Sequence, residues 1–161
     1  MNENIVQKVF DLLISKGMTF ASAESCTGGN IAHQITLIAG SSNVFNGTAV
    51  TYATPIKTKV LGVPIETIEK YTVVSQQVVE DMATGVRDLM DADFGVATTG
   101  VAGPGGGSDL TPVGTVWIGV ASKMGVVSQC YHFKGNRVEV INQATFTAYE
   151  MLKQQIIMTS N

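Results

Sequence analysis

A short segment near the N-terminus combines hydroxyl, thiol and carboxyl groups in a pattern that could support catalysis. Residues 23–29, AESCTGG, follow a strand-like stretch and open a helix-like one. A hydroxyl at such a junction lies near free helix-terminal N–H groups, which can stabilise an oxyanion. Ser25 is therefore a candidate nucleophile. The alternative is a plain cap, in which Ser25 or Thr27 satisfies the helix while Gly28 and Gly29 only permit the turn.

The two residues that flank Ser25 leave alternatives open. Cys26 is either a rival nucleophile or a small buried hydrophobe, which is a common state of free cysteines. Glu24 is a cap, a contact to a ribose hydroxyl, or a structural acid.

A glycine-rich segment follows a second apolar strand. Residues 98–108, TTGVAGPGGGS, hold five glycines within eight positions. Such a loop can direct successive backbone N–H groups at an anion, most often a phosphate. It is not a P-loop, because no Gly-Lys-Ser/Thr ends it, and no helix pattern follows as in the dinucleotide fingerprint. The alternative is a flexible connection, which five clustered glycines make a weak explanation.

A basic residue that could activate Ser25 lies in residues 51–59, TYATPIKTK. A serine hydroxyl needs a base, and a lysine serves if burial or another cation depresses its pKa. Lys57 is the candidate, and Lys59 is a weaker one. The alternative is an ordinary solvated lysine. Arg137, after Gly135-Asn136, is a candidate clamp for a phosphate or carboxylate, or else a surface charge at a helix start.

Metal and cofactor chemistry find no support in the sequence. Neither His33 nor His132 has acidic or cysteine neighbours at ligand spacing. We therefore expect no metal site, no cofactor and no Ser-His-Asp triad. Cys26 and Cys130 form no disulfide framework, which favours a reducing, cytoplasmic compartment.

The elements that must position these groups alternate between helix and strand. Apolar periodicity and capping signals predict helices over residues 4–16, 28–38, 55–61, 75–90 and 137–157. Strands are predicted over residues 18–23, 44–52, 94–99, 115–122 and 126–133, the last two as a hairpin. This alternation predicts one α/β domain over residues 1–161. We expect a three-layer α/β/α sandwich with a mixed, mainly parallel sheet.

Composition excludes several classes of protein. Hydrophobic residues make up 45% of the chain and charged residues 14%, which is the reverse of a disordered composition. The net charge of −3 disfavours nucleic-acid binding, which rests on a basic surface. No apolar run approaches the roughly 18 residues of a membrane span, and the N-terminus lacks the pattern of a signal peptide. We therefore expect a cytoplasmic protein with neither nucleic acid nor membrane as a partner.

The motifs together resemble a known family. SAESCTGG, VTYATPIKTKVLGV, TTGVAGPGGGS followed by PVGTVWIG, and GNR before QAT are similar to the CinA C-terminal domain family. Within it, the resemblance is to the stand-alone nicotinamide-nucleotide amidases, and it runs over roughly residues 5–155. The length equals that of the stand-alone domain, so we expect no fused molybdopterin-binding-like domain.

The resemblance implies hydrolysis of nicotinamide mononucleotide to nicotinate mononucleotide and ammonia, without a metal. It places the nucleophile on Ser25 and the base on Lys57, with Tyr52 beside them to orient the lysine or relay its proton. It also implies a homo-oligomer, a dimer or higher. The positions that it implies for substrate binding are Glu24, Thr27, Gly28, Gly29, Thr99, Gly100, Gly103, Gly105, Gly106 and Arg137.

The chain departs from the family pattern at several positions. Ala53-Thr54 stands where Ser-Asn is frequent, and Asn136 stands where Asp is frequent. Ile141 and Asn142 occupy positions that often carry arginine, so we expect weaker phosphate binding. The alternative function is a nucleotide-binding or regulatory domain of the competence- or damage-inducible type, without turnover.

Overall fold

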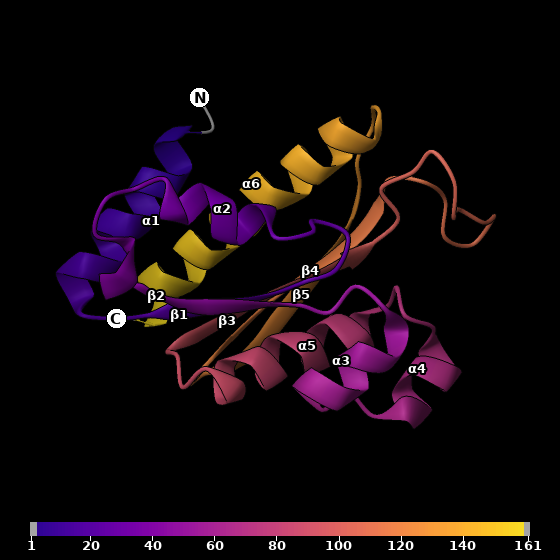
Figure 1. Cartoon of the computed structure of the whole chain (residues 1–161), viewed down its shortest axis with the longest axis horizontal. Helices are drawn as coiled ribbons and strands as arrows, with labels where there is room; N and C mark the ends of the chain where they lie inside the picture. Colours follow the sequence, from indigo (N-terminus) through magenta and orange to yellow (C-terminus); the bar gives the residue numbers. More distant parts are fainter. Residues whose placement is uncertain (1–2, 160–161) are drawn as a thin grey trace.

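A five-stranded sheet forms the centre of the molecule (Figure 1). The computed structural model describes residues 3–159. In spatial order the strands are β2 (Phe45–Val50), β1 (Phe20–Glu24), β3 (Phe94–Gly100), β4 (Thr115–Ser122) and β5 (Gly125–His132). β1 pairs in parallel with β2 and β3, whereas β4 runs antiparallel to both β3 and β5. Four of the five described strands therefore point the same way, which confirms the mixed, mainly parallel sheet and the hairpin.

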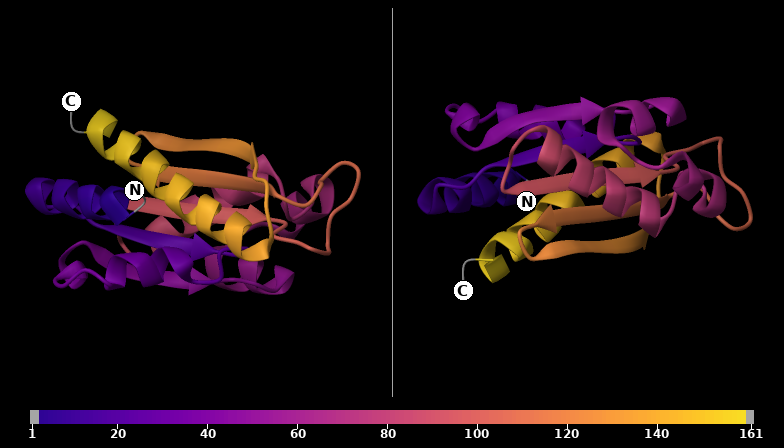
Figure 2. Two further views of the ribbon diagram at one scale, coloured as in Figure 1. Left: turned by 90° about the horizontal axis from the view of Figure 1, so that it is seen from above. Right: turned by 90° about the horizontal axis from the view of Figure 1, so that it is seen from below.

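Helices cover both faces of this sheet, as the two views in Figure 2 show. α1 (Glu3–Lys16), α2 (Asn30–Thr36) and α6 (Arg137–Thr159) lie on one face. α3 (Thr54–Leu61), α4 (Ile65–Tyr71) and α5 (Gln76–Leu89) lie on the other. Each face has its own buried apolar cluster. The three-layer sandwich is therefore confirmed. Among the helices within residues 3–159, none is both long and apolar enough to cross a membrane.

The sequence prediction was least accurate around α2 and α4. α2 begins at Asn30, because Gly28 and Gly29 adopt φ values of 61° and 103° that belong to a turn. α4 and the short 3-10 helix Ser41–Asn43 were not predicted. The prediction for α5 was more accurate, since the Ser75 hydroxyl accepts a hydrogen bond from the Val78 amide at its start.

Close backbone packing fixes the position of α3, which carries Lys57. Gly85 of α5 faces the carbonyl of Leu61, the last residue of α3, and a Cβ atom at Gly85 would collide with it. Gly95 of β3 faces the carbonyl of Ala83 on α5 in the same way. α5 is thereby held tightly between β3 and α3.

Candidate active site

The candidate site lies at the carboxyl ends of β1, β2 and β3, where open α/β sheets bind ligands. Ser25 follows β1, and Lys57 lies in α3 after β2. The Ser25 amide donates to the Thr98 carbonyl at 3.2 Å, and the Thr51 amide donates to the Glu24 carbonyl at 3.0 Å. These bonds hold the three strand ends together. Above them is a cleft of about 320 Å³ whose charged lining residues are Lys57 and Arg137.

Lys57 contacts the candidate nucleophile directly. Its Nζ atom lies 3.0 Å from Ser25 Oγ, 2.5 Å from the Thr51 carbonyl oxygen and 3.3 Å from the Tyr52 carbonyl oxygen. The two carbonyls can only accept, so a neutral amine would donate its two N–H groups to them. Its lone pair would then face the Ser25 hydroxyl. This is the arrangement that a general base requires.

The surroundings of Lys57 lower the pKa of its amine, because burial outweighs an opposing interaction with Cys26. The Lys57 side chain is 1% exposed, and burial lowers its pKa from the usual 10.5. In the described part of the chain the one salt bridge joins Lys153 to Glu150, so Lys57 has no acidic partner there. The sequence interpretation of Lys57 as a base is thus favoured over that of a solvated lysine.

Cys26 also lines the cleft, but its thiol is a poor nucleophile. Burial raises the pKa of Cys26 to about 12 and outweighs the hydrogen bonds of the thiol to Thr98 and to the backbone, which lower it. The reactive form of a cysteine is the thiolate. Cys26 therefore stays protonated near neutral pH, which favours Ser25 as the nucleophile.

Glu24 is fully buried and does not line the cleft. Its Oε1 atom accepts from the Thr27 hydroxyl at 2.7 Å and the Ile31 amide at 2.9 Å. Its Oε2 atom accepts from the Ala32 amide at 3.1 Å. The expected substrate contact at Glu24 does not fit this position. The cap and the structural acid, both left open by the sequence, do fit it, because the carboxylate accepts from two amides at the start of α2.

The turn after Ser25 also differs from the expectation. Thr27, Gly28 and Gly29 do not line the cleft. The Gly28 amide donates to the Ser25 carbonyl at 3.0 Å, and the Thr27 hydroxyl lies 2.9 Å from that of Thr98. These three residues build the turn instead of contacting a ligand in the cleft. The sequence suggested that the start of α2 supplies free N–H donors. The Ile31 and Ala32 amides there instead donate to Glu24.

The glycine-rich loop does line the cleft, as expected. The residues predicted for binding that take part are Thr99, Gly100, Gly103, Gly105 and Gly106. The glycines are nevertheless required for different reasons. A Cβ atom at Gly103 or Gly107 would collide with Val113, and one at Gly100 would collide with the Thr115 carbonyl. A Cβ atom at Gly105 would meet no protein atom within 4 Å. Gly100, Gly103 and Gly107 therefore serve close packing, whereas Gly105 presents open backbone.

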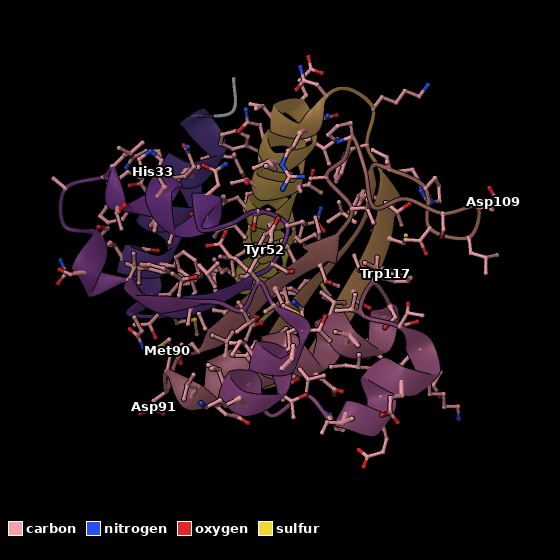
Figure 3. All side chains as sticks on the ribbon, turned by 45° about the vertical axis from the view of Figure 1, so that its right-hand side comes forward. His33, Tyr52, Met90, Asp91, Asp109 and Trp117 are labelled. Atoms are coloured by element: carbon pink, nitrogen blue, oxygen red, sulfur yellow. The ribbon has the colours of Figure 1, made fainter. Side chains whose placement is uncertain are left out.

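Arg137 and Tyr52 meet over the cleft. The Arg137 Nη1 atom donates to the Gly103 carbonyl at 2.6 Å, and Nη2 donates to the Tyr52 hydroxyl at 2.8 Å. Tyr52 is 58% exposed, and Figure 3 shows it well away from His33 and Asp109. The sequence suggested that Tyr52 orients Lys57. Its hydroxyl does not do so, whereas its backbone carbonyl accepts from the lysine. Both partners of Arg137 among the described residues are neutral, and no salt bridge there involves it, so the guanidinium charge is fixed in place without being neutralised.

Several cleft residues were missed by sequence reasoning. Val73 and Val74 precede α5 and line one wall, while Thr54, Val101 and Ala102 line others. From the sequence alone, two adjacent valines that line a cleft cannot be distinguished from two that lie in the core. Among residues 3–159, no three His, Cys, Asp or Glu side chains lie close enough together to hold a metal ion.

Comparison with known proteins places these features in a family. The profile of the CinA C-terminal domain family matches residues 2–156. A CinA-like protein from Flavobacterium psychrophilum is 47% identical over 146 residues, which cover 91% of this chain and 35% of the relative. One from Fervidobacterium nodosum is 43% identical, over 92% of this chain and 36% of the relative. The chain thus spans about a third of the length of these relatives.

Two solved structures extend the similarity to three dimensions. The crystal structure of a CinA superfamily protein from Klebsiella pneumoniae is 34% identical and superposes with a TM-score of 0.94. The aligned region covers 98% of this chain and 99% of the Klebsiella protein. A competence/damage-inducible protein from Agrobacterium tumefaciens is 38% identical, with a TM-score of 0.91 over 94% of this chain and 93% of that chain.

Proposed function

The chain belongs to the CinA C-terminal domain family, and from this premise we propose that it hydrolyses the carboxamide of nicotinamide mononucleotide through Ser25. The observation that carries the proposal is the 3.0 Å contact between Ser25 Oγ and a buried lysine without an acidic partner in the described part of the chain. A serine and a neutral lysine at this distance form a nucleophile and its base.

The first step is acylation of Ser25. Ser25 Oγ attacks the carboxamide carbon while its proton passes to Lys57 Nζ. The carbon–nitrogen bond of the tetrahedral intermediate then breaks, and the Lys57 ammonium returns the proton to the departing nitrogen, which leaves as ammonia. The products of this step are an ester on Ser25 and a neutral Lys57.

The second step is hydrolysis of that ester. Lys57 removes a proton from water, whose oxygen attacks the ester carbon. The bond to Ser25 Oγ breaks, and the proton returns from Lys57 to Ser25. Nicotinate mononucleotide leaves, and the resting state of the pair is restored.

Two features support binding of an anionic nucleotide in the cleft. Arg137 holds an uncompensated charge, and guanidinium N–H groups beyond the two already engaged remain for a phosphate.

The proposal is tested by incubating the purified protein with nicotinamide mononucleotide and measuring both ammonia and nicotinate mononucleotide. We expect equal amounts of both products, and none from the Ser25→Ala variant. Calorimetric titration of that variant with the nucleotide should still show binding. Binding by the unmutated chain without any product would instead support a nucleotide-binding or regulatory domain, and the amidase proposal would be wrong.

A further inference from the structure

The carboxylate of Glu24 is connected to β1, β2, the turn after Ser25 and α2. Besides Thr27 and the two α2 amides, its Oε2 atom lies 3.2 Å from the hydroxyls of Ser22 on β1 and Thr48 on β2. The carboxylate is fully buried and has no cationic partner within the described chain. A buried charge without an ion pair is costly unless hydrogen bonds satisfy it. Here the Thr27 hydroxyl and the Ile31 and Ala32 amides donate to the carboxylate, and the hydroxyls of Ser22 and Thr48, which also bond to one another, lie within reach of Oε2.

These contacts fix both ends of the turn that carries Ser25. Glu24 itself precedes Ser25, and the Ile31 and Ala32 amides that it accepts from are the first free amides of α2. The N-cap position of α2 is Gly29, which has no side chain to cap the helix. Glu24 therefore caps α2 from the preceding strand, and so sets the distance between the end of β1 and the start of α2.

The middle of the turn is fixed by the same carboxylate. The Thr27 hydroxyl donates to Glu24 Oε1, so its oxygen is left to accept from the Thr98 hydroxyl 2.9 Å away. The Thr98 carbonyl in turn accepts from the Ser25 amide. A circuit of hydrogen bonds thus runs from Glu24 through Thr27 and Thr98 to Ser25, and the peptide bond between Glu24 and Ser25 closes it. The side chain of Ser25 contributes nothing to this circuit and is free to face Lys57.

We propose that Glu24 is a positioning residue for Ser25: its buried carboxylate holds the turn so that Ser25 Oγ stays at the Lys57 amine. This inference rests on the proposed function for its catalytic consequence. A displacement of the nucleophile by about 1 Å can cost on the order of a hundredfold in rate. Loss of the carboxylate therefore lowers kcat and leaves KM nearly unchanged, because Glu24 does not line the cleft.

The test compares Glu24→Gln with Thr27→Val, which removes one hydroxyl of the circuit and keeps the side-chain shape. Tyr149→Phe is the matched control, because the Tyr149 hydroxyl donates to the Ile31 carbonyl and so also stabilises α2, and it is not among the hydrogen-bond donors to Glu24. Each variant is assayed for kcat, KM, thermal midpoint and the rate at which a fluorophosphonate labels Ser25. Labelling reports the nucleophile independently of amide hydrolysis.

We expect kcat and the labelling rate to fall at least tenfold in Glu24→Gln and Thr27→Val, with KM within twofold. Tyr149→Phe should lower the thermal midpoint and leave both rates within twofold. If folded Glu24→Gln labels and turns over as the unmutated chain does, the proposal is overturned. Equal losses in Tyr149→Phe would also overturn it, because they would trace to α2 stability alone. If Glu24→Gln does not fold, Thr27→Val decides by the same criteria. Labelling that depends on Glu24 in a chain without amidase activity would sink the proposed function and leave this inference standing.

Discussion

Replacement of Lys57 by methionine removes the amine and keeps an unbranched side chain of similar length. General base catalysis contributes about 10²- to 10⁴-fold, so kcat should fall by that factor, or by about 3–5 kcal/mol of transition-state stabilisation. Two carbonyls, those of Thr51 and Tyr52, lose their contact with Nζ. Each unsatisfied carbonyl costs about 1–3 kcal/mol, but the variant no longer buries an amine. These effects oppose each other, so we expect the variant to fold.

The pH dependence provides the second measurement. Because burial lowers the pKa of Lys57, kcat/KM of the unmutated chain should rise with pH through a single ionisation below 10.5. The pKa of Cys26, at about 12, lies above this range and does not interfere. The free energy of unfolding also depends on the protonation of Lys57. The unfolded chain binds the Lys57 proton up to pH 10.5 and the folded chain releases it earlier, so this contribution to stability grows as pH rises through that window.

In Lys57→Met, the rise of kcat/KM with pH and the rise of stability with pH should both disappear. The assay measures ammonia release and thermal midpoints between pH 6 and pH 10 for the two proteins. A variant that kept more than a tenth of kcat would refute the assignment of Lys57 as the base. A difference in thermal midpoint that did not change with pH would show that Lys57 does not titrate in this window.

The remaining predictions concern other parts of the cleft. Cys26→Ala should keep kcat within about threefold, whereas Ser25→Ala should have none; the reverse result in an ammonia assay would exchange their roles. Arg137→Gln should raise KM for the mononucleotide about tenfold or more while leaving the activity on free nicotinamide unchanged, as charge-assisted contacts to a phosphate predict. Gly103→Ala should lower the free energy of unfolding by about 1–3 kcal/mol because of its positive φ and its close contact. Gly105→Ala should leave urea unfolding unchanged and weaken nucleotide binding. Prolonged treatment with a chelator should not change ammonia release. A loss of activity that an added divalent ion restores would contradict the mechanism.

Most of the fold could be predicted from the sequence because local signals agree with the tertiary structure. Ser75 is followed by apolar residues at helical spacing, and the structure has the capped helix there. α4 could not be predicted, since its seven residues, IETIEKY, are too few to show a helical period and bury no side chain fully. The boundary of α2 was misplaced because nothing local distinguishes two glycines in a turn from two in a helix.

The candidate site was predicted in part. Ser25 and Lys57 were identified by residue type and by the family resemblance, and the structure brings them together. The direction in which Glu24 and Tyr52 point could not be predicted. In the sequence both are polar neighbours of reactive groups, yet one turns into the core and the other out to Arg137. The partners that receive them, the amides of α2 and Arg137 of α6, lie in elements that come later in the chain.

The packing of α5 against α3 makes the chain unevenly tolerant of substitution. Gly85 carries no functional group and lies outside the cleft, yet a single methyl group there would press on the carbonyl of Leu61. Leu61 is one helical turn beyond Lys57, so that pressure would reach Nζ through a helix of only eight residues. A library that varies residues by their distance from the cleft would treat Gly85 as free to change. Selection for activity should instead reject nearly every substitution at that position.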